Sequence, residues 1–303
     1  MNNLSSEKKL ASGLYLVATP IGNLEDITLR ALRVLESVDR IACEDTRQTQ
    51  KLLNHFQIKK PTVSYHLHNE GSRSEDLIEE LRAGGRVAIV SDAGTPGIAD
   101  PGGVLVQAAI AAGVPVFPVP GANAAVSALI ASGLSTESFF FHGFLPSKPG
   151  QRKTFFETLA GKTEAGPSAA LRSGRDDNDL SPTHIFYDSP QRIVDTLSDV
   201  EAVFGASHAV AVARELTKMH EEFLRGTVAD VREALAARDQ VRGEIVLMIS
   251  GEFAAAEVVG SIGDAVSALM KDGLSEKDAL KRVAKDRGLG KSDVYREWQR
   301  SRG

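Results

Sequence analysis

Short apolar segments alternate with helical patterns through the first half of the chain, and this alternation constrains the fold more than any other feature. Apolar runs typical of strands cover residues 14–18, 39–43, 62–67, 86–91 and 114–119. A short apolar helix is expected over 104–112, ended by Gly113. Strands that alternate with helices form mostly parallel sheets covered by helices on both faces. The sequence therefore predicts an α/β fold.

A second α/β unit is expected from Pro120 onward, since 303 residues are enough for about two domains. The pattern predicts a helix of small residues over 122–132 and strands over 139–144, 184–187, 209–214 and 244–250. Residues 161–182 combine glycine, serine and charge without periodicity, which predicts an exposed mobile loop. The predicted domains are 13–119 and 120–252, after a flexible N-terminus over 1–12.

Residues 260–303 predict a small helical module of the helix-turn-helix kind. The signals are a capping box of Ser275 with Asp278, a helix break at 288–290, a cap at Ser292, and a second helix that carries Val294, Tyr295 and Trp298. From Asp264 onward there are ten Lys or Arg and seven Asp or Glu, so this tail carries +3 on a chain of net charge −5. A basic tail favours a polyanionic partner. The alternative is a helical hairpin that only packs on the rest of the protein.

Several classes of protein are excluded by what the sequence lacks. No run of 18 or more apolar residues exists, so no membrane span is expected, and the polar start lacks a secretory signal. The single cysteine, Cys43, excludes a disulfide framework and a cysteine-cluster zinc site. We interpret Cys43 as a small apolar residue that packs in the core. His66 and His68 have no third ligand at a suitable spacing, so no metal site is expected. A cytoplasmic protein is predicted.

Glycine- or proline-rich turns directly follow the predicted strands at 19–23, 91–97, 118–123 and 188–190. Ligands of open α/β sheets bind at the carboxyl ends of the strands, where glycines let them approach the main chain. One such turn is usually an ordinary loop, but four at one sheet edge favour a binding site. The first turn lacks G-x-G-x-x-G and the chain lacks G-x-x-x-x-G-K-[ST], which excludes a nicotinamide dinucleotide site and a P-loop.

The segment Ser91–Gly102, SDAGTPGIADPG, resembles the signature of the small-subunit ribosomal RNA methyltransferase I family, part of the tetrapyrrole-methylase superfamily. Supporting segments lie at 15–28, 42–47, 120–123, 186–190 and 213–218, so the resemblance covers nearly the whole chain. It implies a parallel-sheet N-terminal domain, a mixed-sheet second domain and a homodimer. It also implies that S-adenosylmethionine, held between the domains, methylates the ribose 2′-oxygen of a cytidine in the decoding region of 16S ribosomal RNA. The expected partner is that RNA or the small ribosomal subunit.

By analogy with the superfamily, cofactor contacts are expected at Pro20, Ile21, Asp92, Ala93, Gly94, Thr95, Ile98, Gly121, Ala122, Asn123, Tyr187, Ala213 and Glu244. Small residues and few charges suit a cationic sulfonium with an attached adenosine. Ile98 and Ala213 also fit a plain role in the core.

A ribose hydroxyl is a poor nucleophile, so a general base is expected to assist. The candidates lie at the ends of the second and third strands: Glu44, Asp45, Arg47, His66, Asn69 and Glu70. A carboxylate or histidine would accept the proton, while Arg47 would hold a phosphate or fix a carboxylate. The alternative is a structural cluster of ion pairs, and the sequence does not single out the base.

Two further functions compete with RNA methylation. One is methylation of a small tetrapyrrole-like macrocycle, because the superfamily shares its cofactor site. The other is a non-catalytic RNA-binding assembly factor. The polar blocks at 44–47 and 65–70 and the basic tail favour RNA over a macrocycle, and the intact turn at 92–96 argues against a non-catalytic protein.

Overall fold

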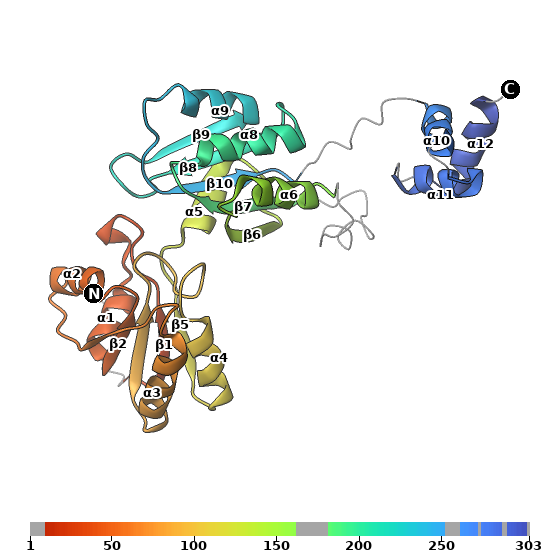
Figure 1. The fold of residues 1–303 in the computed structure, drawn as a ribbon. Helices are drawn as coiled ribbons and strands as arrows, with labels where there is room; N and C mark the ends of the chain where they lie inside the picture. Colours follow the sequence, from red (N-terminus) through yellow and green to blue (C-terminus); the bar gives the residue numbers. More distant parts are fainter. Residues whose placement is uncertain (1–9, 162–180, 252–260, 272–273, 287–289, 302–303) are drawn as a thin grey trace, which may run out of the picture. The chain divides into compact units, whose positions relative to one another are not determined.

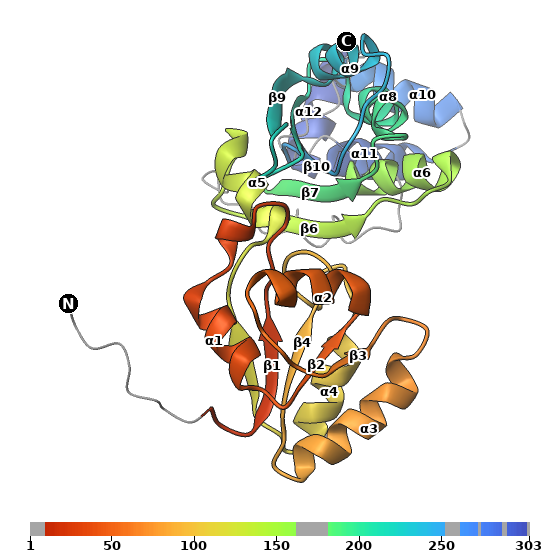
Figure 2. The same cartoon turned by 90° about the vertical axis from the view of Figure 1, so that its left-hand side faces the viewer.

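The computed structural model describes residues 10–161, 181–251, 261–271, 274–286 and 290–301. The chain divides into two compact units, Met1–Glu252 and Phe253–Gly303. The first unit contains two sheets, each with its own helices (Figures 1 and 2). We call residues 10–119 the first lobe and residues 120–251 the second lobe. The predicted flexible N-terminus and mobile loop fall mostly on 1–9 and 162–180, outside the described residues.

The first lobe is a parallel five-stranded sheet with the order β3-β2-β4-β1-β5. Its strands are β1 (Gly13–Val17), β2 (Arg40–Cys43), β3 (Thr62–Ser64), β4 (Arg86–Val90) and β5 (Val116–Val119). Its helices are the 3₁₀ turn η1 (Leu24–Asp26), α1 (Leu29–Ser37), α2 (Thr46–His55), α3 (Glu70–Arg82) and α4 (Gly103–Ala111). This part of the predicted fold class is confirmed.

Both faces of the first sheet are covered. Alternate strand residues such as Val17 and Val90 pack with α1 and α2 in one core cluster. The residues between them, such as Leu14 and Ile89, pack with α3 and α4 in another. A strand buried on both faces is apolar at every position, which is why these strands could be recognised in the sequence.

The predicted third strand is too long. Strand β3 ends at Ser64, whereas the apolar pattern predicted strand to Leu67. The backbone N–H of His66 donates to the side-chain oxygen of Asn69 at 2.8 Å, and the Asn69 amide donates to the Ser64 carbonyl at 3.2 Å. These local bonds turn the chain away from the sheet toward α3.

The second lobe is a mixed sheet with the order β6-β7-β10-β8-β9, in which β6 and β7 are parallel and the other pairs antiparallel. Its strands are β6 (Phe139–Phe144), β7 (Thr183–Asp188), β8 (Ala209–Arg214), β9 (Glu222–Thr227) and β10 (Ile245–Ile249). Its helices are α5 (Ala124–Ser132), α6 (Pro149–Leu159), α8 (Ile193–Phe204) and α9 (Val228–Ala236). The predicted mixed sheet is confirmed.

Helices again cover both faces of this sheet. Helices α6, α8 and α9 contribute Phe156, Leu197 and Val231 to one core cluster, while α5 packs on the opposite face through Ala128 and Leu129. Helix α5 starts two residues later than predicted, because the Asn123 side chain accepts the Val126 N–H and caps it.

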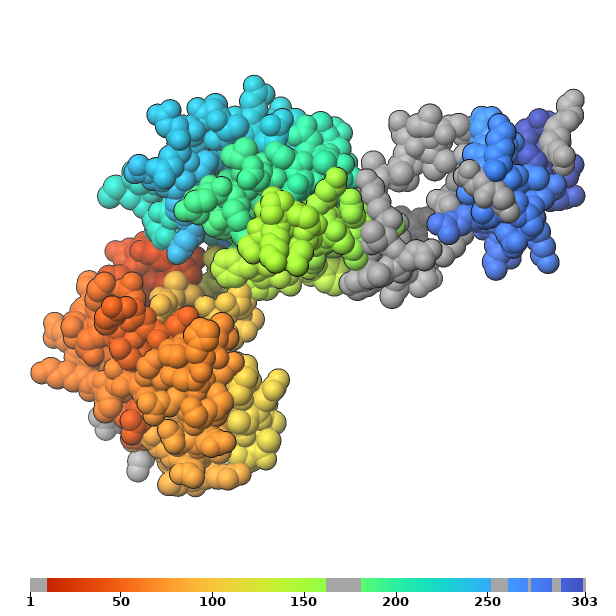
Figure 3. Space-filling model, viewed as in Figure 1, coloured from red at the N-terminus to blue at the C-terminus, as the bar shows by residue number. Residues whose placement is uncertain are grey.

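The two lobes of the first unit touch. The backbone N–H of Asn23, in the turn after β1, donates to the Thr217 hydroxyl in the loop after β8 at 3.1 Å. In the space-filling view the red-to-yellow surface of the first lobe meets the green-to-blue surface of the second (Figure 3). The carboxyl ends of the first sheet's strands are therefore brought against the second lobe.

The unit at the C-terminus consists of α10 (Ile262–Lys271), α11 (Glu276–Asp286) and α12 (Lys291–Ser301) around a small apolar core. The Ser275 hydroxyl accepts the Asp278 N–H at 3.2 Å and pairs with its carboxylate at 2.6 Å, as the predicted capping interaction requires. One prediction here was wrong, the helix cap at Ser292. Helix α12 already includes Ser292, since it begins after Gly290. It carries Val294, Tyr295 and Trp298 as predicted; Val294 and Trp298 are buried, and Tyr295 is 51% exposed. None of the helices that the structure describes could span a bilayer.

Candidate functional site

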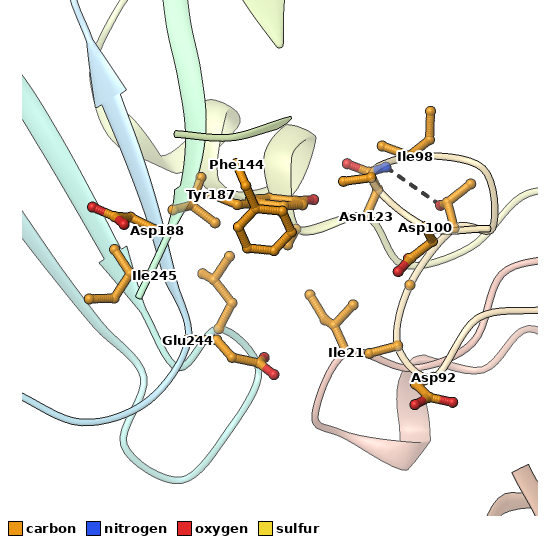
Figure 4. Close-up of a pocket in the computed structure, with 17 residues that line it drawn as sticks. Ile21, Asp92, Ile98, Asp100, Asn123, Phe144, Tyr187, Asp188, Glu244 and Ile245 are labelled. Carbon is orange, nitrogen blue, oxygen red and sulfur yellow. Dashed lines mark hydrogen bonds between the residues drawn. The ribbon is translucent and has the colours of Figure 1, made fainter. Parts of the chain in front are cut away.

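A cavity of about 280 Å³ lies where the turns after β1, β4 and β5 face the second lobe (Figure 4). From the first lobe and the start of α5 it is lined by Ile21, Asp92, Ala93, Gly94, Thr95, Ile98, Ala99, Asp100, Asn123 and Ala124. From the rest of the second lobe it is lined by Phe144, Tyr187, Asp188, Leu216, Glu244, Ile245 and Val246. Mostly apolar walls with a few polar groups are typical of small-molecule sites.

Hydrogen bonds hold the three turns of the first lobe in fixed positions. Thr19 and Gly94 exchange backbone bonds of 2.8 and 3.0 Å, which links the turn after β1 to the turn after β4. The Thr95 hydroxyl donates to the Ala122 carbonyl at 3.0 Å, which links the turn after β4 to the segment after β5. This wall of the cavity is therefore preorganised.

The backbone conformation and the packing at position 94 both require glycine. Its φ of +84° is in the left-handed region that side chains rarely adopt, and a Cβ there would lie 3.2 Å from Ile21 Cγ2. The N–H of Gly94 is already bonded to Thr19. This glycine therefore shapes the cavity that it lines.

The opposite wall is aromatic and aliphatic. Tyr187 on β7 packs edge-to-face against Phe144 at 5.4 Å between ring centroids, and Leu216 and Val246 continue the apolar surface. Phe144 is 63% exposed. A planar heteroaromatic ring such as adenine fits a wall of this kind.

Two carboxylates of the second lobe are held in different ways. Asp188 is buried and accepts bonds from the Arg192 guanidinium and the Thr196 hydroxyl, so its role is structural. The side chain of Glu244 is 74% exposed and lies 3.1 Å from Lys218 Nζ. Of the two, Glu244 remains able to bind a ligand's hydroxyl or amino groups.

Most of the predicted cofactor residues line the cavity: Ile21, Asp92, Ala93, Gly94, Thr95, Ile98, Asn123, Tyr187 and Glu244. Pro20, Gly121, Ala122 and Ala213 do not. A Cβ at Gly121 would lie 2.9 Å from the Ala18 Cβ, and Ala213 is fully buried in the core beside α5. The structure thus gives these two residues packing roles.

Sequence reasoning missed several lining residues. They are Ala99, Asp100, Ala124, Phe144, Asp188, Leu216, Ile245 and Val246. Asp100 is part of the same signature segment as Asp92 and Gly94, which was the available signal. Phe144 is the last residue of the aromatic strand, and its exposure follows from the position of β6 at the sheet edge.

Among the predicted catalytic residues, Asp45 and Arg47 bind each other. The Asp45 carboxylate accepts the Arg47 backbone N–H at 2.8 Å, which caps α2, and two guanidinium bonds of 2.9 and 3.1 Å. The Arg47 guanidinium lowers the pKa of Asp45 to about 2. A carboxylate of that pKa is a poor proton acceptor at neutral pH. The Arg47 side chain is 86% exposed and remains accessible to a substrate.

Asn69 and Glu70 belong to the start of α3. Both Asn69 side-chain groups are used to hold the turn after β3, and the Glu70 N–H donates to the His66 carbonyl at 3.0 Å. His66 differs from them, because its Nδ1 atom is buried without a hydrogen-bond partner among the described residues.

Glu44 lies next to the cavity without lining it. Burial raises the pKa of Glu44, and the nearby Asp92 carboxylate raises it further. The charge of His66 lowers the pKa of Glu44. Glu44 and His66 therefore lie close to the cavity but are not among the residues that line it. Over the part of the chain that the structure describes, no group of three or more His, Cys, Asp or Glu is arranged to hold a metal ion.

Residues 13–232 match the sequence profile of the family described as Tetrapyrrole (Corrin/Porphyrin) Methylases. The chain is 47% identical over 288 residues to the ribosomal RNA small subunit methyltransferase I of Halalkalibacterium halodurans, with 93% of each chain covered. It is 43% identical over 290 residues to the protein of the same name from Bacillus subtilis, covering 93% of this chain and 92% of that relative.

Solved structures share the fold at lower identity. Uroporphyrin-III C-methyltransferase from Thermus thermophilus superposes with a TM-score of 0.50 at 23% identity, covering 79% of this chain and 94% of that one. Diphthine synthase superposes with a TM-score of 0.55 at 12% identity, covering 79% and 90%. At these identities the likeness shows the fold alone.

Proposed function

The chain belongs to the ribosomal RNA small subunit methyltransferase I family within the tetrapyrrole methylases, and from this membership we propose that it methylates the ribose 2′-oxygen of a cytidine in the decoding region of 16S ribosomal RNA. It is an S-adenosylmethionine-dependent ribosomal RNA methyltransferase. The atom and nucleotide that receive the methyl group are the proposed part.

The structural observation that supports methyl transfer is the cavity between the lobes. Its volume of about 280 Å³ is close to the range of small-molecule sites. Its aromatic wall fits adenine, and its carboxylates Asp92, Asp100 and Glu244 favour a ligand that carries positive charge. S-adenosylmethionine supplies the activated methyl group as a cationic sulfonium. The residues present therefore fit this cofactor.

The residues that would hold the cofactor come from both lobes. Ile21, Ile98 and Tyr187 would pack against the adenosine, and Glu244 would accept hydrogen bonds from ribose hydroxyls. Methyl transfer is an in-line displacement that depends chiefly on proximity and orientation. Turns tied together by backbone bonds supply that orientation at little further entropic cost.

Exposed basic groups support RNA as the acceptor. Arg47 projects from the start of α2, near the carboxyl end of the first sheet, with most of its guanidinium in solvent. In the unit at the C-terminus, Lys277, Lys281 and Lys291 are exposed. Such groups contact phosphates and give affinity without base selection.

We assign the enzyme to the cytoplasm, where small ribosomal subunits are assembled, and we propose that it acts as a homodimer. The family resemblance supports both statements. Size-exclusion chromatography with light scattering tests the second, since a monomeric mass at working concentration would contradict it.

A methyl-transfer assay with labelled cofactor tests the proposed substrate. We expect label in 16S RNA of small ribosomal subunits or of naked RNA, and none in a tetrapyrrole precursor. Label in the tetrapyrrole alone would establish the macrocycle alternative. Cofactor binding without transfer to any of these substrates would support a non-catalytic assembly factor.

A further inference from the structure

A second hollow lies on the surface of the first lobe, outside the cofactor cavity. It is a groove of about 410 Å³ between α2 and the edge strand β3, and we call it the α2 groove. It is lined by Thr46, Arg47, Gln50, Lys51, Asn54 and Thr62. Each of these side chains carries a hydrogen-bonding group, and none is a carboxyl group. Such a lining favours a polar, anionic ligand over an apolar one.

The helical repeat produces this lining. The exposed lining residues of α2, from Arg47 to Asn54, are three or four positions apart and therefore share one face of the helix. On the opposite face Thr49 and Leu53 are buried, and Leu53 packs in the core over the first sheet. At 1.5 Å per residue the exposed face extends over about 10 Å. Packing thus fixes the helix while its polar face remains in solvent.

The segment around the groove is basic on a chain of net charge −5. From Thr46 to Asn69 it contains four Lys or Arg and no Asp or Glu. The Lys51 ammonium donates to the side-chain oxygen of Gln48 at 3.0 Å, and no carboxylate of the described residues lies within ion-pair distance of it. Lys51 therefore has its charge available for an anion.

Two amide side chains of the groove are ordered by each other. The Gln50 amide nitrogen donates to the Asn54 side-chain oxygen at 2.8 Å. The remaining side-chain oxygen of Gln50 and the amide nitrogen of Asn54 make no hydrogen bond to the described residues. An acceptor and a donor side by side suit a ribose 2′-hydroxyl, which both donates and accepts.

The α2 groove begins beside the cofactor cavity. Asp45, directly before α2, donates its backbone N–H to the carboxylate of Asp92, which lines the cavity, at 3.1 Å. In Figure 2, α2 lies at the end of the first sheet that faces the second lobe. The cavity carboxylates Asp92, Asp100 and Glu244 repel phosphates, whereas the groove attracts them. This contrast keeps an RNA backbone outside the cavity and favours its binding along α2.

We propose that the α2 groove binds the ribose–phosphate backbone of the ribosomal RNA strand next to the acceptor nucleotide, an inference that rests on the proposed function. Arg47 and Lys51 contact phosphates, while Gln50, Asn54 and Thr62 bind ribose hydroxyls. Phosphates of a stacked strand are about 3.4 Å apart along the axis, so the exposed face of α2 spans about three of them. Binding the strand at these points places the acceptor hydroxyl at the cavity.

The first test is the kinetics of Lys51→Glu with small ribosomal subunits and saturating S-adenosylmethionine. The KM for subunits should rise at least tenfold, while kcat at saturating subunits stays within about twofold. The slope of log affinity against log salt should fall by about 1. Arg82→Glu is the matched control, because Arg82 is an exposed cation in the last turn of α3, which packs on the opposite face of the sheet. Its KM should change less than twofold.

Two measurements show that the effect is not structural. Lys51→Gln, which removes the charge without reversing it, should give a KM between those of the wild type and Lys51→Glu. Both variants should unfold at the wild-type temperature and bind S-adenosylhomocysteine as tightly as the wild type, because Lys51 is exposed and does not line the cavity. Equal KM values for Lys51→Glu and Arg82→Glu would overturn the inference, as would a parallel loss of cofactor affinity.

Crosslinking tests where the RNA strand lies. A photoreactive phenylalanine analogue placed at the exposed position of Gln50 should crosslink to nucleotides within about three positions of the methylated one. Crosslinks only to remote parts of the RNA, or no crosslink to RNA, would contradict binding of the adjacent strand.

The wild-type enzyme distinguishes failure of this inference from failure of the proposed function. A wild type that places no methyl group on ribose contradicts the proposed function whatever α2 binds. A wild type that methylates ribose, together with a Lys51→Glu variant of unchanged KM, contradicts the inference alone. If RNA affinity is kept by Lys51→Glu but lost when Lys277, Lys281 and Lys291 are replaced by glutamine, the unit at the C-terminus binds the backbone and the inference is overturned.

Discussion

Replacing Gly94 with valine tests whether the turn after β4 shapes the cofactor site. Gly94 has a φ of +84°, and both its backbone N–H and its carbonyl oxygen are hydrogen-bonded to the backbone of Thr19. A Cβ would lie 3.2 Å from Ile21 Cγ2 and 3.7 Å from the Ala122 carbonyl oxygen. The two γ-methyl groups of valine would extend beyond that Cβ into the region of Ile21. The substitution therefore displaces a side chain that lines the cavity.

The substitution is expected to affect both stability and cofactor binding, and the protein tolerates the first effect. The left-handed φ alone should lower the free energy of unfolding by about 1–2 kcal/mol. That is a tolerable part of the 5–15 kcal/mol typical of folded domains, so the protein should stay folded. Displacement of Ile21 should weaken S-adenosylmethionine binding at least tenfold, which corresponds to about 1.4 kcal/mol.

Calorimetric titration with S-adenosylmethionine and urea denaturation measure the two effects. Gly113→Val is a matched control, because Gly113 has a φ of +70° and nothing lies within 4 Å of its Cβ position. It should lose similar stability and bind the cofactor normally. The reasoning fails if Gly94→Val binds as the wild type does, or if both variants lose affinity equally.

Three further predictions concern the substrate side and stability. Arg47→Ala should lower methylation of small ribosomal subunits at least tenfold and leave cofactor affinity unchanged, since the guanidinium is exposed outside the cavity. Full activity of this variant, or loss of cofactor binding, would contradict a role of Arg47 in substrate binding. Replacing Lys277, Lys281 and Lys291 together with glutamine should weaken RNA binding and reduce the slope of log affinity against log salt by about 2, whereas an unchanged slope would give the tail a packing role. Burial lowers the pKa of His184 from 6.5 to about 3, so the unfolded chain binds a proton that the folded chain does not. The free energy of unfolding should therefore decrease as pH falls below about 6.5, by on the order of 3 kcal/mol at about pH 4. Urea denaturation at several pH values should show a weaker pH dependence for His184→Gln than for the wild type. Identical pH dependence in the two proteins would refute this prediction.

The sheets could be predicted where burial on both faces makes a strand continuously apolar, as in β4 and β10. Strand β9 was missed because it is an edge strand whose sequence, Glu222–Thr227, has no apolar run and whose residues are half-buried or exposed. The end of β3 depended on the Asn69 side chain, which competes with the sheet for backbone groups. Local side-chain bonds of this kind are not visible in an apolar pattern.

The site could be located from the turns that follow strands, but the roles of single residues could not. Gly94 and Gly121 look alike in sequence, yet only Gly94 lines the cavity, while Gly121 packs on Ala18. Asp45 and Asp100 are both acidic residues after a strand or in a turn. Arg47 lowers the pKa of Asp45 to about 2, whereas burial raises that of Asp100 to about 6. These differences depend on tertiary contacts.

The most direct test of the central claim is the chemical position of the transferred methyl group. Small ribosomal subunits incubated with the enzyme and S-adenosylmethionine carrying a labelled methyl group can be digested to nucleosides and separated by liquid chromatography with mass spectrometry. The account predicts that the label appears as 2′-O-methylcytidine from the decoding region of 16S ribosomal RNA. Label on a nucleobase, or on a ribose other than that of a cytidine, would contradict it.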